Sequence, residues 1–326
     1  MLRIGEPEDE SEFPDPYTPT SIRPIPPHKR RCLDSRVAGR LPRTTYSEVP
    51  VRGGDVPDEP SQQQASAAMW KRWLESVVVI LAVLLFPAPV PHEAWWLVWA
   101  ALAWSGLVGL TVAARWPVAT RITTLSGLGM VVRLSVPRLW PGLVPLVVSF
   151  AIAAILGRRF RTLRPLTKLP RGSLDRDVRW MVAAVVVVAA AGIATWVAAA
   201  GPDAYSEGTR LAVRQARAQP IWIVAPVGVL FAVANAGAEE AFFRGAFMGG
   251  LTDSVGLSAA LPIQALSFGL LHLGGFPSGF VGVVLAAAYG VMLGLLRIRA
   301  RGLLAPWMAH ALADLAIISV IVWVAR

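Results

Sequence analysis

The chain has 326 residues, of which 55% are hydrophobic and only 16% are charged, and its mean hydropathy is +0.53. This composition is too apolar for an ordinary soluble protein of this length and indicates a polytopic membrane protein. The formal net charge of +10 does not indicate nucleic-acid binding, because the arginines lie between apolar segments in the pattern of positively charged cytoplasmic loops.

Residues 1–68 are predicted to form a disordered cytoplasmic tail. This segment is rich in proline, serine and charged residues and has no apolar periodicity. It contains the only cysteine, Cys32, which excludes an internal disulfide and a cysteine metal cluster.

Several later stretches reach the ~20 apolar residues that a spanning helix needs. Alternating strand patterns are absent, so the predicted fold class is all-α, a polytopic transmembrane helical bundle of about eight or nine spans. The spans are expected near residues 73–90, 94–114, 139–157, 180–200, 221–248, 257–273, 276–296 and 302–324.

The ninth segment, residues 121–137, must cross or re-enter if the tail and the basic loop 158–179 lie on the same side of the membrane. With the basic "RIRAR" of residues 297–301 also on the cytoplasmic side, the loop 201–220 falls outside. We therefore predict N-terminal transmembrane helices over residues 69–200 and a second transmembrane domain over residues 201–326. The expected location is the plasma membrane of a prokaryote.

Ionisable residues are few in the C-terminal third, and most of them interrupt apolar segments. Asp253 is assigned to a loop. Each of the others costs ~2.5 kcal/mol or more at mid-membrane, so such groups usually face a bundle interior and have a function. The remaining acidic residues and histidines after position 220 are Glu239, Glu240, His272, His310 and Asp314.

Helical spacing assigns a partner to one of the two adjacent glutamates. Glu240 and Arg244 are four residues apart and can form an ion pair. Glu239 points about 100° away from Glu240. Glu240 can thus be held ionised while Glu239 is desolvated beside a negative neighbour, and such unequal carboxylates suit acid/base chemistry.

The two histidines also have neighbours one turn away. Phe268 precedes His272 by four residues, so its ring can pack beneath the imidazole. His310 precedes Asp314 by four residues, and this aspartate can accept a hydrogen bond from the imidazole and set its tautomer.

Three motifs occur in order on successive predicted helices: "EEAFFR" at residues 239–244, "FGLLH" at 268–272 and "HALAD" at 310–314. In this order they resemble the CPBP family, which includes CAAX prenyl proteases of the Ras-converting type, bacteriocin-processing enzymes and the Abi proteins. The resemblance covers about residues 220–324.

The resemblance implies that residues 201–326 form the catalytic domain of an intramembrane glutamic-type endopeptidase, with a cavity open towards the cytoplasm. Glu239 and His272 would activate a water that attacks the scissile carbonyl, and a well-placed carboxylate can pass its proton to the leaving amine. His310, with Asp314, would lie in the oxyanion-stabilising position.

Many relatives have an asparagine where this chain has Asp314, and an ionised aspartate cannot donate to an oxyanion. Asp314 is therefore expected to orient His310 or to be protonated itself. Glu240, Arg244 and Phe268 are expected to organise the site.

No cofactor is predicted. Two histidines and several carboxylates could hold zinc, but the H-E-x-x-H motif is absent. The expected partners are the lipid bilayer and a peptide or lipid-anchored protein substrate, with no nucleic acid. The alternative function is that of a non-proteolytic membrane protein, either a proton-coupled carrier or an immunity factor that acts by binding.

Small residues recur at four-residue spacing around the predicted site and favour close helix packing. The G-x-x-x-G motifs are Gly245 with Gly249, Gly275 with Gly279, and Gly290 with Gly294.

Overall fold

The computed structural model describes residues 62–87, 94–135, 143–163, 169–201 and 205–325. Over these ranges the chain is helical and contains no strand, which confirms the predicted all-α class. Most of the predicted tail lies outside the described residues. Its last part, residues 62–68, forms the first turns of helix α1 instead. The segment "QQQASAA" lacks the large apolar residues that mark a membrane span, but it consists mainly of good helix formers.

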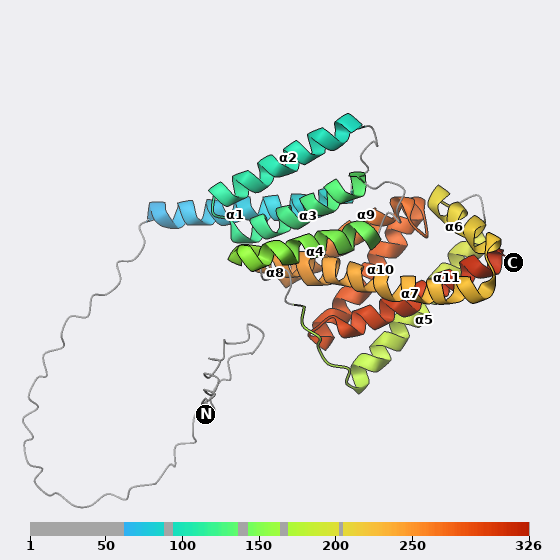
Figure 1. Ribbon diagram of the computed structural model, residues 1–326. Helices are drawn as coiled ribbons and strands as arrows, with labels where there is room; N and C mark the ends of the chain where they lie inside the picture. The colour runs from blue at the N-terminus through green and yellow to red at the C-terminus, as the bar shows by residue number, and fades with distance from the viewer. Residues whose placement is uncertain (1–61, 88–93, 136–142, 164–168, 202–204, 326) are drawn as a thin grey trace, which may run out of the picture. The chain divides into compact units, whose positions relative to one another are not determined.

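Four helices precede the basic loop (Figure 1), and α3 lies among the other three. The doubtful ninth segment largely coincides with α3. Its polar side chains Thr120, Thr123 and Ser126 are buried, and both threonine hydroxyls donate to backbone carbonyls one turn back. The helices are α1 (Gln62–Leu85), α2 (Ala94–Ala113), α3 (Pro117–Ser135) and α4 (Leu143–Arg159).

The C-terminal helices pack in pairs, α9 with α10 and α7 with α11, and α5 lies against both α10 and α11. Helix α1 contacts α8 and α9 and so connects the two groups of helices. A π turn, Ala241–Phe247, joins α7 to α8, and a 3-10 turn, His272–Gly274, follows α9. The helices are α5 (Arg176–Ala200), α6 (Glu207–Ala218), α7 (Ile221–Glu240), α8 (Met248–Val255), α9 (Leu257–Leu271), α10 (Gly279–Ala300) and α11 (Leu304–Ala325).

Five of the described helical segments are long and apolar enough to cross a membrane, so the protein is an integral membrane protein. A sixth, Val98–Ala113, is apolar but shorter. Of the eight or nine predicted spans, five thus coincide with these candidate spans; the others fall on α1–α4. The five segments are Arg176–Ala200, Ile221–Val255, Leu257–Gly274, Gly279–Ala300 and Leu304–Trp323.

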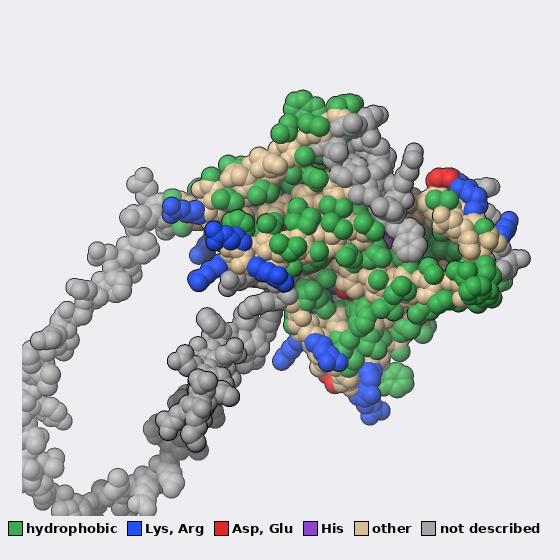
Figure 2. Space-filling model, in the orientation of Figure 1, with side chains coloured by type: hydrophobic (Ala, Val, Ile, Leu, Met, Phe, Trp, Pro, Cys, Tyr) green, Lys and Arg blue, Asp and Glu red, His purple; other side chains and the backbone are tan. Residues whose placement is uncertain are grey.

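Hydrophobic side chains cover most of the helical surface seen in Figure 2, and lysine and arginine gather at its margins. Exposed tryptophans lie near helix ends, where the amphipathic indole ring fits the membrane interface. They include Trp95, Trp96, Trp180, Trp222 and Trp323.

The two basic segments predicted to share one side of the membrane do lie at the same end of the helices. The backbone N–H of Ser173 donates to the carbonyl of Ala300, and that of Leu304 donates to the carbonyl of Arg171. Gly172 makes this contact possible, since its φ is +78° and a Cβ there would meet the Ala300 carbonyl oxygen and the backbone of residue 302.

Ion pairs reinforce this end. Arg299 at the end of α10 contacts the carboxylates of Asp175 and Asp177 at 3.1 and 2.9 Å. Asp175 also caps α5, and the N–H of Val178 lowers the pKa of its carboxyl, with Arg299 adding to the effect.

The glycine motifs behave differently from one another. Gly290 lies against the backbone of Ala265 on α9 and so permits the close α9–α10 contact, as the motif predicts. The prediction for Gly275 and Gly279 is wrong, because Gly275 ends the 3-10 turn and Gly279 begins α10 with a φ of +72°. At Gly249 no atom lies within 4 Å of a built Cβ.

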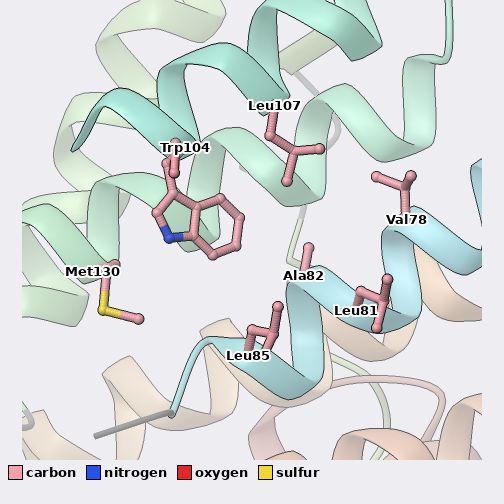
Figure 3. Close-up of a pocket in the computed structure, with 8 residues that line it drawn as sticks. Val78, Leu81, Ala82, Leu85, Trp104, Leu107 and Met130 are labelled. Atoms are coloured by element: carbon pink, nitrogen blue, oxygen red, sulfur yellow. The ribbon is translucent and has the colours of Figure 1, made fainter. Parts of the chain in front are cut away.

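An apolar pocket of about 320 Å³ lies between α1, α2 and α3 (Figure 3). None of the predicted site residues lines it, so it is separate from the buried ionisable groups. Its lining includes Leu81 and Leu85 on α1, Trp104 and Leu107 on α2, and Met130 on α3.

Gly269 provides a test of the α9–α10 contact. A Cβ at this position would lie 2.6 Å from the Val283 carbonyl oxygen and 2.8 Å from the Ala287 Cβ. Gly269→Ala should destabilise the protein by about 1–3 kcal/mol through overpacking. Gly249→Ala is the matched control and should leave stability unchanged or raise it by up to ~1 kcal/mol, because alanine favours a helix. Thermal unfolding in detergent, followed by circular dichroism, compares them; equal transitions would contradict the predicted close approach.

Candidate active site

The π turn at Ala241–Phe247 shapes the first motif. Phe242, Phe243 and Phe247 of this turn are completely buried and pack edge to face with Phe86 of the α1 C-terminus or with one another. A π turn displaces a backbone carbonyl from the regular α-helical ladder. Here the carbonyl of Arg244 accepts a hydrogen bond of 2.7 Å from Nε of Arg297 on α10.

Glu240 lies at the centre of the buried polar groups. Its Oε1 accepts one hydrogen bond from Nη1 of Arg244 at 2.8 Å and another from Nδ1 of His310 at 2.7 Å. The exposed fractions of Glu240, Arg244 and His310 are 1%, 0% and 3%, so water does not replace these contacts. The predicted ion pair is confirmed. The hydrogen bond from His310 was missed because it joins α7 to α11, and nothing in the sequence specifies that pairing.

His310 uses its other nitrogen differently from the prediction. Its Nε2 lies 3.5 Å from Glu239 Oε2 and 3.7 Å from Asp314 Oδ1. The latter distance is too long for a hydrogen bond, so the predicted bond to Asp314 is absent. Glu240 orients the imidazole instead, because its carboxylate accepts from Nδ1–H.

Asp314 has a different partner, Asn235 on α7. The Nδ2 of this buried asparagine donates to Asp314 Oδ2 at 3.1 Å. The sequence prediction missed Asn235, although a signal was present. Asn235 precedes Glu239 by four residues and so shares its helical face.

Phe268 joins the three motifs. Its ring centroid lies 4.7 Å from that of His272 and 5.8 Å from that of His310, and the Arg244 guanidinium lies over its face at 4.4 Å, a cation–π geometry. The predicted packing against His272 is confirmed. The same ring also positions Arg244 and His310.

His272 is oriented by its own helix end. It begins the 3-10 turn, and its Nδ1–H donates to the carbonyl of Phe268 at 3.0 Å. That bond leaves Nε2 free. His272 is half-buried, and among the described residues no carboxylate lies within 4 Å of it, so the structure does not bring it into direct contact with Glu239.

Glu239 is the buried acid with the fewest partners. Its exposed fraction is 6%, and its only close polar neighbour in the described part of the chain is His310 at 3.5 Å. Glu240 and Asp314, in contrast, each accept at least one shorter hydrogen bond. Three acids of similar chemistry thus lie in three distinct environments.

Other polar residues around the site were not predicted. Gln264 on α9 donates to the carbonyl of Gly290 at 3.1 Å. The Tyr289 ring on α10 meets the His310 ring edge to face at 5.6 Å. Gln264 precedes Phe268 by four residues, so a spacing signal was present for it, whereas only the packing of α10 against α11 reveals Tyr289.

Two histidines and three carboxylates are the candidate metal ligands of the site. No group of three or more histidine, cysteine, aspartate or glutamate side chains among the described residues has an arrangement suited to hold a metal ion. The ion pairs of His310 and Glu240 instead use the donor atoms that a metal would need.

Comparison with known proteins agrees with the motifs. Residues 220–316 match the family model described as "Type II CAAX prenyl endopeptidase Rce1-like". The match contains all seven predicted site residues, from Glu239 to Asp314, and confirms the family suggested by the motifs. No curated protein and no solved structure matches the chain.

The link between Arg297 and the π turn can be tested by removing the donor. Arg297→Met keeps an apolar stem but leaves the Arg244 carbonyl without its partner, which should destabilise the protein by about 1–3 kcal/mol. Arg299→Met, two residues later, removes exposed ion pairs and should change stability little. Urea or thermal unfolding in detergent distinguishes them; two equally mild variants would show that the carbonyl does not need Arg297.

The pair of Asn235 and Asp314 calls for a double-mutant cycle. Asn235→Leu and Asp314→Leu should each destabilise the protein, since each leaves a buried polar partner unsatisfied, whereas the double variant removes both groups. A coupling free energy of at least ~0.5 kcal/mol is expected in thermal unfolding. Strict additivity of the two single changes would refute the pairing.

Proposed function

Because residues 220–316 belong to the Rce1-like family of type II CAAX prenyl endopeptidases, we propose that this membrane protein is an intramembrane endopeptidase. The proposed mechanism is of the glutamic type, with Glu239 as the general base. The supporting observation is that Glu239 is the buried carboxylate without a committed hydrogen bond in the described site, as a general base needs to be before water enters.

The reaction begins with a water held between Glu239 and His272. His272 contacts the Phe268 ring, which also contacts His310, and His310 in turn lies 3.5 Å from Glu239. The proposed water bridges the two ends of this chain of contacts. Glu239 takes a proton from this water while the water oxygen attacks the carbonyl carbon. Glu239 then returns that proton to the leaving nitrogen as the C–N bond breaks, so the carboxylate is regenerated.

His272 has a positioning and polarising role in this scheme. Its Nδ1–H is held by the Phe268 carbonyl, so the lone pair of Nε2 can accept a hydrogen bond from the same water. As an imidazolium, with a proton on each ring nitrogen, His310 is the proposed donor to the oxyanion. Glu240 occupies its Nδ1 and leaves Nε2 to face the acids and the reacting carbonyl.

Glu240, Arg244 and Phe268 serve as supports for His310 and His272. The Glu240 carboxylate holds Arg244 and His310 together, and Phe268 contacts both histidine rings. Asp314, held by Asn235, adds negative charge near Nε2 of His310. The mechanism has no step through a metal, so cleavage should be insensitive to chelators.

We propose a peptide or a lipid-anchored protein as substrate, presented at the cytoplasmic face of a prokaryotic plasma membrane. The family description names a CAAX prenyl substrate, which is one kind of lipid-anchored protein. The apolar helix surfaces support a membrane-bound chain as the substrate rather than a soluble globular one.

The substrate can be identified from the cleavage products that accumulate in the membrane. Membranes containing the wild type or Glu239→Gln at equal levels would be compared by mass spectrometry of terminal peptides. A new C-terminus that depends on the wild-type protein identifies the cleavage site. If no terminus depends on Glu239, the endopeptidase proposal fails, and transport or binding becomes the function to pursue.

The catalytic assignments are tested with a peptide that spans this site and protein purified in lipid nanodiscs. Glu239→Gln and His272→Ala should each lower kcat by about 10²–10⁴-fold, the range for loss of general acid–base catalysis. Glu207→Gln on α6 is the control, because its carboxylate is exposed and pairs with Arg210 and Arg214; it should keep full activity. Activity retained by both Glu239→Gln and His272→Ala would disprove the mechanism.

A further inference from the structure

Tyr289 on α10 has a buried hydroxyl that makes no hydrogen bond within the described part of the chain. Such groups are rare in native proteins, since an unsatisfied buried donor costs about 1–3 kcal/mol. Tyr289 also lies in a segment that is otherwise apolar, "VLAAAYGVMLGLL" at residues 284–296. A phenylalanine would fill the same space without the cost, so the hydroxyl needs an explanation.

The hydroxyl belongs to the candidate active site. The Tyr289 ring meets the ring of His310 at 5.6 Å and 86°. His310 in turn contacts two of the acids, Glu240 at 2.7 Å and Glu239 at 3.5 Å. Its missing partner is therefore to be sought among molecules that enter the site.

Most donors in the site are already used. Asn235 donates to Asp314, and Nη1 of Arg244 donates to Glu240. The Nδ1–H of His310 is also held by Glu240. Asp314 cannot donate while it is ionised.

Besides the Tyr289 hydroxyl, three buried atoms near the site lack a hydrogen bond within the described part of the chain. Two of them are acceptors: Oε2 of Glu240 and Oε1 of Gln264. The third is Nε of Arg244, whose guanidinium is fully buried beneath the Phe268 ring. Tyr289 is thus the uncommitted neutral donor next to His310, and an oxyanion is commonly stabilised by more than one donor.

We propose that the Tyr289 hydroxyl is a catalytic group that donates a hydrogen bond to the carbonyl oxygen of the scissile peptide as that oxygen becomes negative, beside Nε2 of His310. This assignment rests on the proposed endopeptidase function. Tyr289 is then the second oxyanion donor of the site. Residue 314 does not fill this role, because an ionised aspartate has no proton to donate. No proton is transferred, because the hydroxyl keeps its hydrogen through the reaction and the water proton still passes through Glu239.

Tyr289→Phe separates catalysis from structure, since it removes only the oxygen. Loss of one oxyanion donor lowers kcat by about 10²–10³-fold in other enzymes, and we expect a decrease of about 10²-fold with KM within about twofold of the wild type. The thermal unfolding temperature should be unchanged or higher, because the variant loses an unsatisfied polar group. The assay uses the peptide that spans the Glu239-dependent cleavage site, with protein in lipid nanodiscs.

Tyr205→Phe is the matched control. Tyr205 is also buried, but its ring stacks on Trp196 and contacts Phe276, away from the acids. It should leave kcat unchanged. A kcat for Tyr289→Phe within about twofold of the wild type would overturn the assignment while leaving the endopeptidase proposal intact. A fall in kcat accompanied by an equal loss of folded protein would also overturn it, and a wild type that cleaves nothing would overturn both.

Discussion

A single oxygen atom, Oε1 of Glu240, holds the polar part of this protein together. It accepts hydrogen bonds from Arg244 and His310, which lie on the π turn and on α11. All three groups are almost completely removed from water. Loss of one member of such a buried pair leaves an uncompensated charge and costs about 3–5 kcal/mol. The relative position of α7 and α11 therefore depends on this contact as much as on apolar packing.

The π turn extends the same constraint to α9 and α10. Because Arg244 is in this turn, its side chain returns to Glu240 while its backbone carbonyl accepts from Arg297 on α10. Its guanidinium also covers the ring of Phe268 on α9. One arginine thus contacts three neighbouring elements, two of them through its guanidinium and the third through its backbone carbonyl. A regular α-helix would keep the carbonyl in its own ladder.

Side-chain contacts within one helix could be predicted from the sequence, whereas side-chain contacts between helices could not. Glu240 with Arg244 and Phe268 with His272 were predictable, because residues four apart share a face. The bond of His310 to Glu240, that of Asn235 to Asp314 and that of Arg297 to Arg244 join residues far apart in sequence, whose pairing depends on how the helices pack. The "G-x-x-x-G" motif correctly predicted a helix contact at Gly290. It failed at Gly275 because α9 has already ended before that residue.

The three buried acids explain how a chemically reactive carboxylate can exist within such a cluster. Glu240 is neutralised by a cation, and Asp314 is held by an amide. These partners fix the orientation of both acids, whereas Glu239, one residue from Glu240, has no hydrogen bond to any residue that the structure describes. A carboxylate in low dielectric surroundings gains most from a proton or from a water that can supply one. The proposed reactivity of Glu239 would thus depend on its neighbours, because Arg244 pairs with Glu240 and Asn235 with Asp314, while His310 lies closer to Glu240 than to Glu239.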